Sequence, residues 1–231
     1  MIFALLPITI LSMAAALAYP WFAETEPKKK VIIKGIASLL FVFGGLVMTI
    51  IDYSTINLLI MLALVFGAIG DFFLALQGTN KDRRVLYTII GGFAFFAGHI
   101  AYIVFFLLLR PLNRWLLFIP AVSLIVPLIF YTPIRMALGT RKFLPLPTCY
   151  FAVVGLMLAS ALNILIVDTS VFGALVFTAG VVFAISDTIL MARFAMKSKK
   201  ARTIASYFIA LLYFSAQWLF IWAVAVTYFG Y

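Results

Sequence analysis

Residues 66–77 read FGAIGDFFLALQ, and this stretch places one carboxylate, that of Asp71, inside a long apolar run. An ionisable side chain in a membrane-length apolar segment costs several kcal/mol or more near the bilayer centre, so it is expected to serve a function. Residues 183–194 read FAISDTILMARF and repeat the arrangement around Asp187. In both stretches a small residue precedes the aspartate and a leucine follows it three positions later. We therefore predict a membrane protein organised around two buried acids.

The composition excludes an ordinary soluble domain. Of the 231 residues 66% are hydrophobic and 10% are charged, with a mean hydropathy of +1.21, whereas soluble domains are about 45–50% apolar and about 25% charged. The apolar runs are continuous rather than alternating, which favours helices over a membrane β-barrel. A spanning helix needs about 20 apolar residues. The sequence thus predicts an all-α, polytopic transmembrane bundle, with residues 1–231 as a single transmembrane domain.

We predict eight spanning helices, at about residues 2–22, 31–51, 56–76, 85–109, 115–131, 146–167, 171–194 and 203–229. Fifteen of the 17 lysines and arginines flank the first, third, fifth and seventh connections, and only Arg110 and Arg114 lie on the other side. The positive-inside rule makes the basic connections cytoplasmic and puts both termini on the non-cytoplasmic side. This topology accounts for the net charge of +10, so we do not expect a nucleic-acid partner.

The two acids share a depth and a spacing. Each lies about five residues from the cytoplasmic end of its predicted helix, or about 8 Å at 1.5 Å per residue. They are 116 residues apart, and the same offset pairs Asp52 with Asp168, Gly70 with Ser186, Leu74 with Leu190, Lys81 with Lys197, Arg83 with Lys199 and Arg84 with Lys200. This pattern suggests a 4+4 internal repeat whose halves run parallel about an axis along the membrane normal.

The sequence offers the two acids no basic partner at the same depth in the predicted helices. Apart from Arg193 near an end, no lysine or arginine lies inside predicted helices three to eight, so we expect Asp71 and Asp187 to depend on each other. Two close carboxylates do not both ionise, which leaves one proton donor and one anion, as acid catalysis requires. The alternative is that each acid pairs with a buried basic or backbone group and only holds helices together.

His99 is the single histidine and lies in the middle of the fourth predicted helix, where it is either a hydrogen-bonded core residue or a site residue. Tyr102 shares its helix face, and Gly98 allows another helix to approach closely. One histidine and one cysteine, Cys149, make a zinc site improbable. We therefore predict no metal site.

Polar residues on other helices are further candidates. Asn163 and Gln217 are buried amides that either join helices or orient water and a substrate hydroxyl, and Tyr213 shares the face of Gln217. Lys34, at the edge of the second predicted helix, either extends to the cytoplasmic interface or binds a lipid phosphate.

Together these motifs resemble the YhhN family of lysoplasmalogenase-type membrane proteins over nearly the whole chain. The matching features are Gly70-Asp71 with Leu74, Gly98-His99 with Tyr102, Ser186-Asp187 with Leu190 and Phe194, and Tyr213 with Gln217. Lys34 resembles a family lysine at the start of the second helix, although Gly35 follows it here where the family usually has proline.

The resemblance implies hydrolysis of the vinyl ether bond of lysoplasmalogens to a fatty aldehyde and a glycerophospho-ethanolamine or -choline, without a cofactor. Asp71 and Asp187 would be the catalytic pair, in unassigned roles. The substrate-binding residues would be His99, Tyr102, Asn163, Tyr213, Gln217 and Lys34, with cytoplasmic arginines as alternative phosphate ligands. The expected partners are a lysophospholipid and membrane lipids.

Two other functions fit the same residues. Intramembrane acids, a histidine and a repeat also suit a proton-coupled transporter. A non-catalytic lipid-binding or scaffold protein is the third interpretation. We expect an integral membrane protein of the bacterial cytoplasmic membrane, or of the endoplasmic reticulum in a eukaryote.

Overall fold

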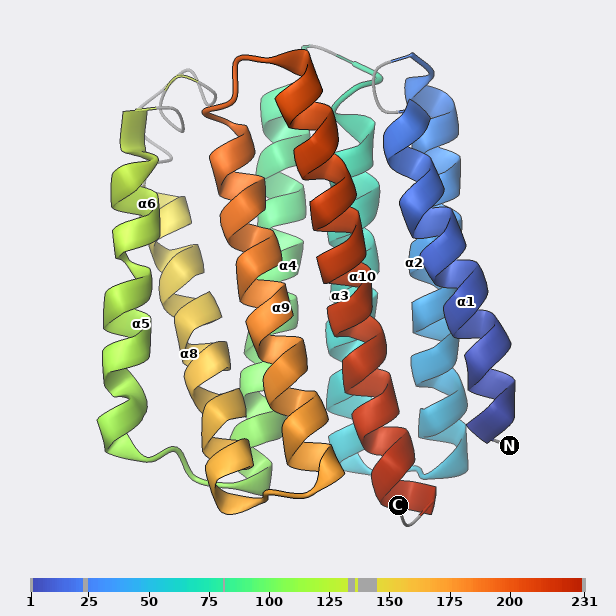
Figure 1. The fold of residues 1–231 in the computed structure, drawn as a ribbon, viewed down its shortest axis with the longest axis vertical. Helices are drawn as coiled ribbons and strands as arrows, with labels where there is room; N and C mark the ends of the chain where they lie inside the picture. The colour runs from blue at the N-terminus through green and yellow to red at the C-terminus, as the bar shows by residue number, and fades with distance from the viewer. Residues whose placement is uncertain (1, 23–24, 81, 133–135, 137–144, 230–231) are drawn as a thin grey trace.

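The computed structural model describes residues 2–22, 25–80, 82–132, 136 and 145–229 (Figure 1). Seven of its helical segments are long and apolar enough to cross a membrane. The long helices are α1 (Ile2–Ala18), α2 (Pro27–Ile51), α3 (Thr55–Leu76), α4 (Arg84–Leu109), α8 (Pro145–Val167), α9 (Val171–Arg193) and α10 (Lys199–Phe229). A 3₁₀ turn, η1 (Tyr19–Phe22), extends α1. The predicted all-α polytopic bundle is confirmed.

The fifth predicted helix is broken rather than continuous. It consists of the 3₁₀ turn η2 (Arg114–Leu117) and the short helices α5 (Phe118–Ser123) and α6 (Ile125–Ile129). Proline inside a helix lacks the N–H and clashes with the carbonyl four residues earlier. For Pro127 that residue is Ser123, where α5 ends. The Ser123 hydroxyl donates to the backbone carbonyl of Phe151 at 2.6 Å, which fastens the broken segment to α8.

The connections alternate between the two ends of the bundle (Figure 1). Those between α1 and α2, α3 and α4, and α9 and α10 lie at one end, and the two termini lie at the other. The connections between these three pairs of helices carry most of the described basic residues. The predicted segregation of charge, with both termini at the opposite end, therefore agrees with the structure. Lys81, Arg135, Arg141 and Lys142, which belong to the predicted basic set, are outside the described residues.

The long helices form a closed ring. Each packs on the next in the order α1, α2, α3, α4, α8, α9 and α10, and α10 packs back onto α1. Helix α10 also contacts α2 and α3. Helix α5 packs outside the ring against α8. Pairs that are distant in sequence, α4 with α8 and α1 with α10, therefore close the bundle.

Helix boundaries follow the predicted repeat. The ends of α2 and α8, at Ile51 and Val167, are 116 residues apart, and so are the starts of α3 and α9, at Thr55 and Val171. Corresponding neighbours also pack together: α2 on α3 as α8 on α9, and α3 on α4 as α9 on α10. The halves differ where they join, because α4 packs on α8 and α5 lies outside. These correspondences support the 4+4 repeat.

Small residues let α3 and α4 approach closely. A Cβ at Gly98 would lie 3.2 Å from the carbonyl oxygen of Ala63, and a Cβ at Gly91 would lie 3.1 Å from that of Gly70. Membrane helices use such residues because association depends on close van der Waals contact. The predicted role of Gly98 in close helix approach is confirmed.

Gly98→Leu should lower the apparent unfolding temperature in detergent by about 5–10 °C, because overpacking by about 2–3 kcal/mol has this effect in a chain of this size. Gly92→Leu on the same helix is the control, since a Cβ there meets nothing within 4 Å. Circular dichroism during heating measures both variants. Equal losses at the two positions would contradict the packing argument.

Labelling of single cysteines should report the orientation of the bundle. In a Cys149→Ser background, we expect a membrane-impermeant maleimide added to intact cells to label Tyr53→Cys and not Ser198→Cys. Tyr53 is 81% exposed between α2 and α3, whereas Ser198 precedes α10 at the basic end. Both should react after the membrane is permeabilised. The reverse pattern would invert the topology.

Candidate active site

Asp71 is held by two residues of the neighbouring helix α2. Lys34 Nζ lies 2.7 Å from Asp71 Oδ1, and their side chains are only 9% and 1% exposed. Ser38, one turn further along α2, donates its hydroxyl to Asp71 Oδ2 at 2.6 Å. The Lys34 ammonium also lies 5.5 Å from the centre of the Tyr19 ring. Asp71 is thus an ion-paired carboxylate in a closed environment.

This arrangement corrects two expectations about Lys34. Helix α2 begins at Pro27, a residue suited to the first helical position, so Lys34 lies inside the helix rather than at its edge. Seven residues correspond to about 10 Å along the axis, close to the depth of Asp71. Lys34 is therefore a buried partner of Asp71 rather than an interfacial lysine, and its role toward a lipid phosphate stays a prediction. Asp71, in turn, does not lack a basic partner.

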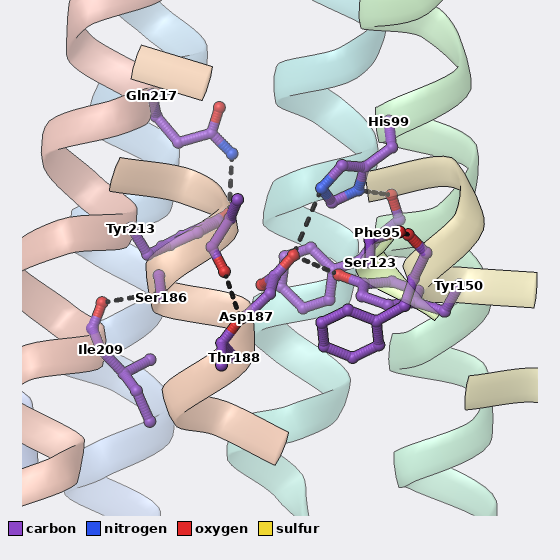
Figure 2. A network of polar contacts seen from close by, with 12 residues as sticks. Phe95, His99, Ser123, Tyr150, Ser186, Asp187, Thr188, Ile209, Tyr213 and Gln217 are labelled. Carbon is purple, nitrogen blue, oxygen red and sulfur yellow. Dashed lines mark hydrogen bonds and ion pairs between the residues drawn. The ribbon is translucent and has the colours of Figure 1, made fainter. Parts of the chain in front are cut away.

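Asp187 has different partners, which come from α4 and α8 (Figure 2). Tyr150 donates its hydroxyl to Asp187 Oδ2 at 2.8 Å, and His99 Nε2 lies 3.3 Å from the same oxygen. The Tyr150 ring meets the His99 ring edge-on, with centroids 5.4 Å apart. The expectation that the two acids depend on each other is therefore wrong, because each carboxylate has partners of its own.

The other imidazole nitrogen fixes the tautomer of His99. Nδ1 lies 2.7 Å from the backbone carbonyl oxygen of Phe95 (Figure 2). A carbonyl oxygen only accepts, so Nδ1 carries a hydrogen. Nε2, which is buried and has no hydrogen bond of ordinary geometry, then faces Asp187 Oδ2 either with a lone pair or with a second hydrogen.

A second network joins α4 to α10. Tyr102 donates to Gln217 Oε1 at 2.6 Å, and Gln217 Nε2 donates to the Tyr213 hydroxyl at 2.9 Å. The Tyr213 hydroxyl also lies near Asp71. Gly67 on α3 leaves room for this network, since a Cβ there would lie 2.7 Å from Gln217 Nε2. Tyr102, Tyr213 and Gln217 thus belong to the surroundings of Asp71.

Phe183 separates the two acid clusters. Its ring centre lies 4.6 Å from that of His99 and 5.4 Å from that of Tyr213. Both aspartates are buried among packed side chains. A small pocket elsewhere is lined by Gly45, Met48, Asn57, Ile60, Ile221 and Val224, none of which is a predicted site residue. Burial of both carboxylates strengthens the electrostatic interactions that each makes with its partners.

Asn163 does not join these clusters. Its Oδ1 accepts the backbone N–H of Asn113 at 3.3 Å, and its Nδ2 donates to the carbonyl of Pro111 at 3.0 Å. Both partners belong to the connection between α4 and α5. Asn163 therefore fastens this connection to α8, the structural alternative for a buried amide, and its contacts give it no place beside the aspartates.

The sequence does not identify Ser38 and Tyr150 as site residues. A serine or tyrosine in an apolar helix has no distinctive pattern, since such side chains bond readily to their own backbone or lie at interfaces. One signal was present, because Tyr150 lies 116 residues after Lys34 and thus corresponds to it in the repeat. Within the described part of the chain, no group of three or more His, Cys, Asp or Glu residues is arranged to hold a metal ion.

Comparison with known proteins gives one match. The model of the YhhN family matches residues 29–224, which is most of the chain. This stretch includes both aspartates and every residue of the two clusters except Tyr19. No curated protein and no solved structure matches the chain.

Removing Lys34 alone should destabilise the protein more than removing the whole ion pair. Lys34→Met leaves an uncompensated buried carboxylate, which typically costs about 3–5 kcal/mol. In the double variant Lys34→Met/Asp71→Leu neither charge of this pair remains, and we expect stability close to that of the wild type. Thermal unfolding in detergent gives the comparison. If the double variant were as unstable as the single one, the pair would not be the buried contact described.

Proposed function

The chain belongs to the YhhN family, and from this premise we propose that it is a membrane-embedded hydrolase of the vinyl ether bond of lysoplasmalogens. The family is associated with lysoplasmalogenase activity, and the chain is a multi-pass membrane protein. The observation that carries the proposal is the pair of buried carboxylates, Asp71 and Asp187, each bound by donors from neighbouring helices. The products would be a fatty aldehyde and a glycerophospho-ethanolamine or -choline.

The chemistry needs one acid and one base. A proton adds to the vinyl carbon distant from the ether oxygen and gives an oxocarbenium ion. Water attacks the carbon next to oxygen and loses a proton to a carboxylate. The resulting hemiacetal separates into the aldehyde and the glycerol hydroxyl, so the net change consumes one water. An anion near the cation stabilises it, and protonation by a positioned acid contributes typically about 10²–10⁴-fold.

The depth of the acids suits this substrate. Asp71 lies five residues before the end of α3 and Asp187 six before the end of α9, both at the basic end of the bundle. These spacings correspond to about 8–9 Å. The vinyl ether of a lysoplasmalogen is attached directly to the glycerol, so a headgroup at the interface would bring it to a similar depth. The alkyl chain would then extend further into the bundle.

Because Lys34 is occupied by Asp71, basic residues at the cytoplasmic end remain as the phosphate ligands in this proposal. An arginine there would bind phosphate through paired N–H donors. His99, Tyr102, Tyr213 and Gln217 would shape the site around the two carboxylates and place the attacking water. We further propose the bacterial cytoplasmic membrane as the location.

Asp71→Asn and Asp187→Asn should each reduce aldehyde release from lysoplasmenylethanolamine by about 100-fold or more, because each removes a carboxylate that takes part in proton transfer. Purified protein in detergent, with lysoplasmenylcholine as a second substrate, is assayed for free aldehyde. Asp168→Asn is the matched control, since this carboxylate lies outside the spanning helices and bonds to the Ser170 N–H. We expect the control to retain wild-type activity.

Full activity in either test variant would refute the two-carboxylate mechanism. If the wild type released no aldehyde from either headgroup, the hydrolase proposal would fail. The proton-coupled transporter would then be the function to examine, by following substrate-dependent proton uptake in vesicles.

A further inference from the structure

We propose that His99 and Asp187 hold one proton between Nε2 and Oδ2, that this pair is the acid of the reaction, and that Tyr150 positions it. The acid role rests on the proposed hydrolysis, whereas the shared proton is inferred from the tautomer of His99 and from the burial of Nε2 near Asp187. The proposal gives the two carboxylates different tasks, with Asp71 as the anion that receives the proton of the attacking water.

The need for a proton follows from the fixed tautomer. Nδ1 carries a hydrogen because it faces the Phe95 carbonyl at 2.7 Å. If Nε2 and Asp187 were both without a proton, a buried nitrogen with no hydrogen-bond partner would lie 3.3 Å from a carboxylate oxygen. Burying an unpaired charge against an acceptor is costly. One proton on either atom turns this repulsion into attraction and makes the pair neutral overall.

Tyr150 restrains Asp187 Oδ2 and His99, the groups that share this proton. Its hydroxyl donates to Oδ2 at 2.8 Å, the same oxygen that faces His99. Its ring meets the imidazole edge-on. The tyrosine therefore restrains both members of the pair, the carboxylate through a hydrogen bond and the imidazole through ring contact. It acts through Asp187 and His99, so it is a positioning residue.

The repeat supports the division of tasks. Tyr150 on α8 lies 116 residues after Lys34 on α2, and Asp187 lies 116 residues after Asp71. In each half, the earlier helix thus presents a donor to the carboxylate of the following one. Lysine supplies a positive charge that compensates an ionised Asp71. Tyrosine supplies a hydrogen bond but no positive charge. The negative charge of the Asp187 carboxylate is therefore neutralised by the proton that it shares with His99.

The proton balance closes over one turnover. The His99–Asp187 pair gives its proton to the vinyl carbon and becomes a single negative charge near the oxocarbenium ion. Water adds to the cation and gives one proton to Asp71. The transfer of that proton back to the His99–Asp187 pair restores the starting state. No oxidant, reductant or co-substrate other than water is needed.

Nitrogen NMR tests the shared proton directly, because His99 is the single histidine of the chain. In protein labelled with ¹⁵N-histidine, we expect Nδ1 to be protonated and Nε2 to show a shift between those of a free lone pair and a full N–H. Asp187→Asn should move Nε2 to the position of an ordinary unprotonated nitrogen. Tyr150→Phe, which keeps the ring contact, should change the Nε2 shift while Nδ1 stays protonated.

Kinetics test the positioning role. Tyr150→Phe removes one hydrogen bond to a carboxylate and should lower kcat for aldehyde release by about tenfold or more, with KM changed less than twofold. Tyr53→Phe, an exposed tyrosine at the opposite end, is the control and should leave both constants unchanged. A purely structural role for Tyr150 would lower the amount of folded protein and leave the Nε2 shift of the folded fraction unaltered.

The two proposals fail in distinguishable ways. An unprotonated Nδ1, or an Nε2 shift that Asp187→Asn does not change, would overturn the shared proton whatever the enzyme's activity. The expected NMR shifts without aldehyde release by the wild type would overturn the acid role together with the hydrolase function. Tyr150→Phe with wild-type kcat and an unchanged Nε2 shift would overturn the positioning role.

Discussion

The ion pair between Lys34 and Asp71 is the constraint on which the arrangement of the bundle depends. Both side chains are almost completely buried, at 2.7 Å from each other, in a chain whose surface must face lipid. Removing two charges from water costs several kcal/mol per ion even after relaxation, and only close pairing with further hydrogen bonds offsets this cost. Helices α2 and α3 must therefore meet at one register, which Ser38 reinforces with its bond to Asp71.

Asp187, the second buried carboxylate, is stabilised by other partners than the lysine that pairs with Asp71. Asp187 has no lysine or arginine among the contacts described above, and its partners are a hydroxyl and an imidazole. An aspartate that no cation compensates is neutral only when it takes up a proton or shares one with a neighbouring group. The chemical difference between the acids thus comes from their partners rather than from repulsion between them. Phe183 lies between the two clusters and contacts both, through the rings of His99 and Tyr213.

The repeat explains why two such sites occur at one depth. Helices α3 and α9 begin at the same offset as their two aspartates, so Asp71 and Asp187 lie at corresponding positions near the basic end. The halves are not equivalent, because α10 packs within the bundle while α5 and α6 lie outside the ring. Residues of α4 and α10 can thus serve both acids: His99 contacts Asp187, and Tyr102 with Gln217 reaches Tyr213 beside Asp71.

The sequence by itself determined the seven long helices, the segregation of basic residues at one end, the place of Asp71 and Asp187 near the ends of their helices, and the family, because apolar length, loop charge and motif spacing are properties of the linear chain. It did not determine which side chains meet. The pattern leaves Lys34 open between an interfacial and a phosphate-binding role, leaves Asn163 open between a structural and a site role, and does not mark Tyr150. Some of these contacts join consecutive helices, as Lys34 with Asp71 and Tyr150 with Asp187, and another joins distant helices, as His99 on α4 with Asp187 on α9. The rotation and register at which the helices pack decide which side chains meet, since apolar helices in lipid carry no one-dimensional signal for their neighbours.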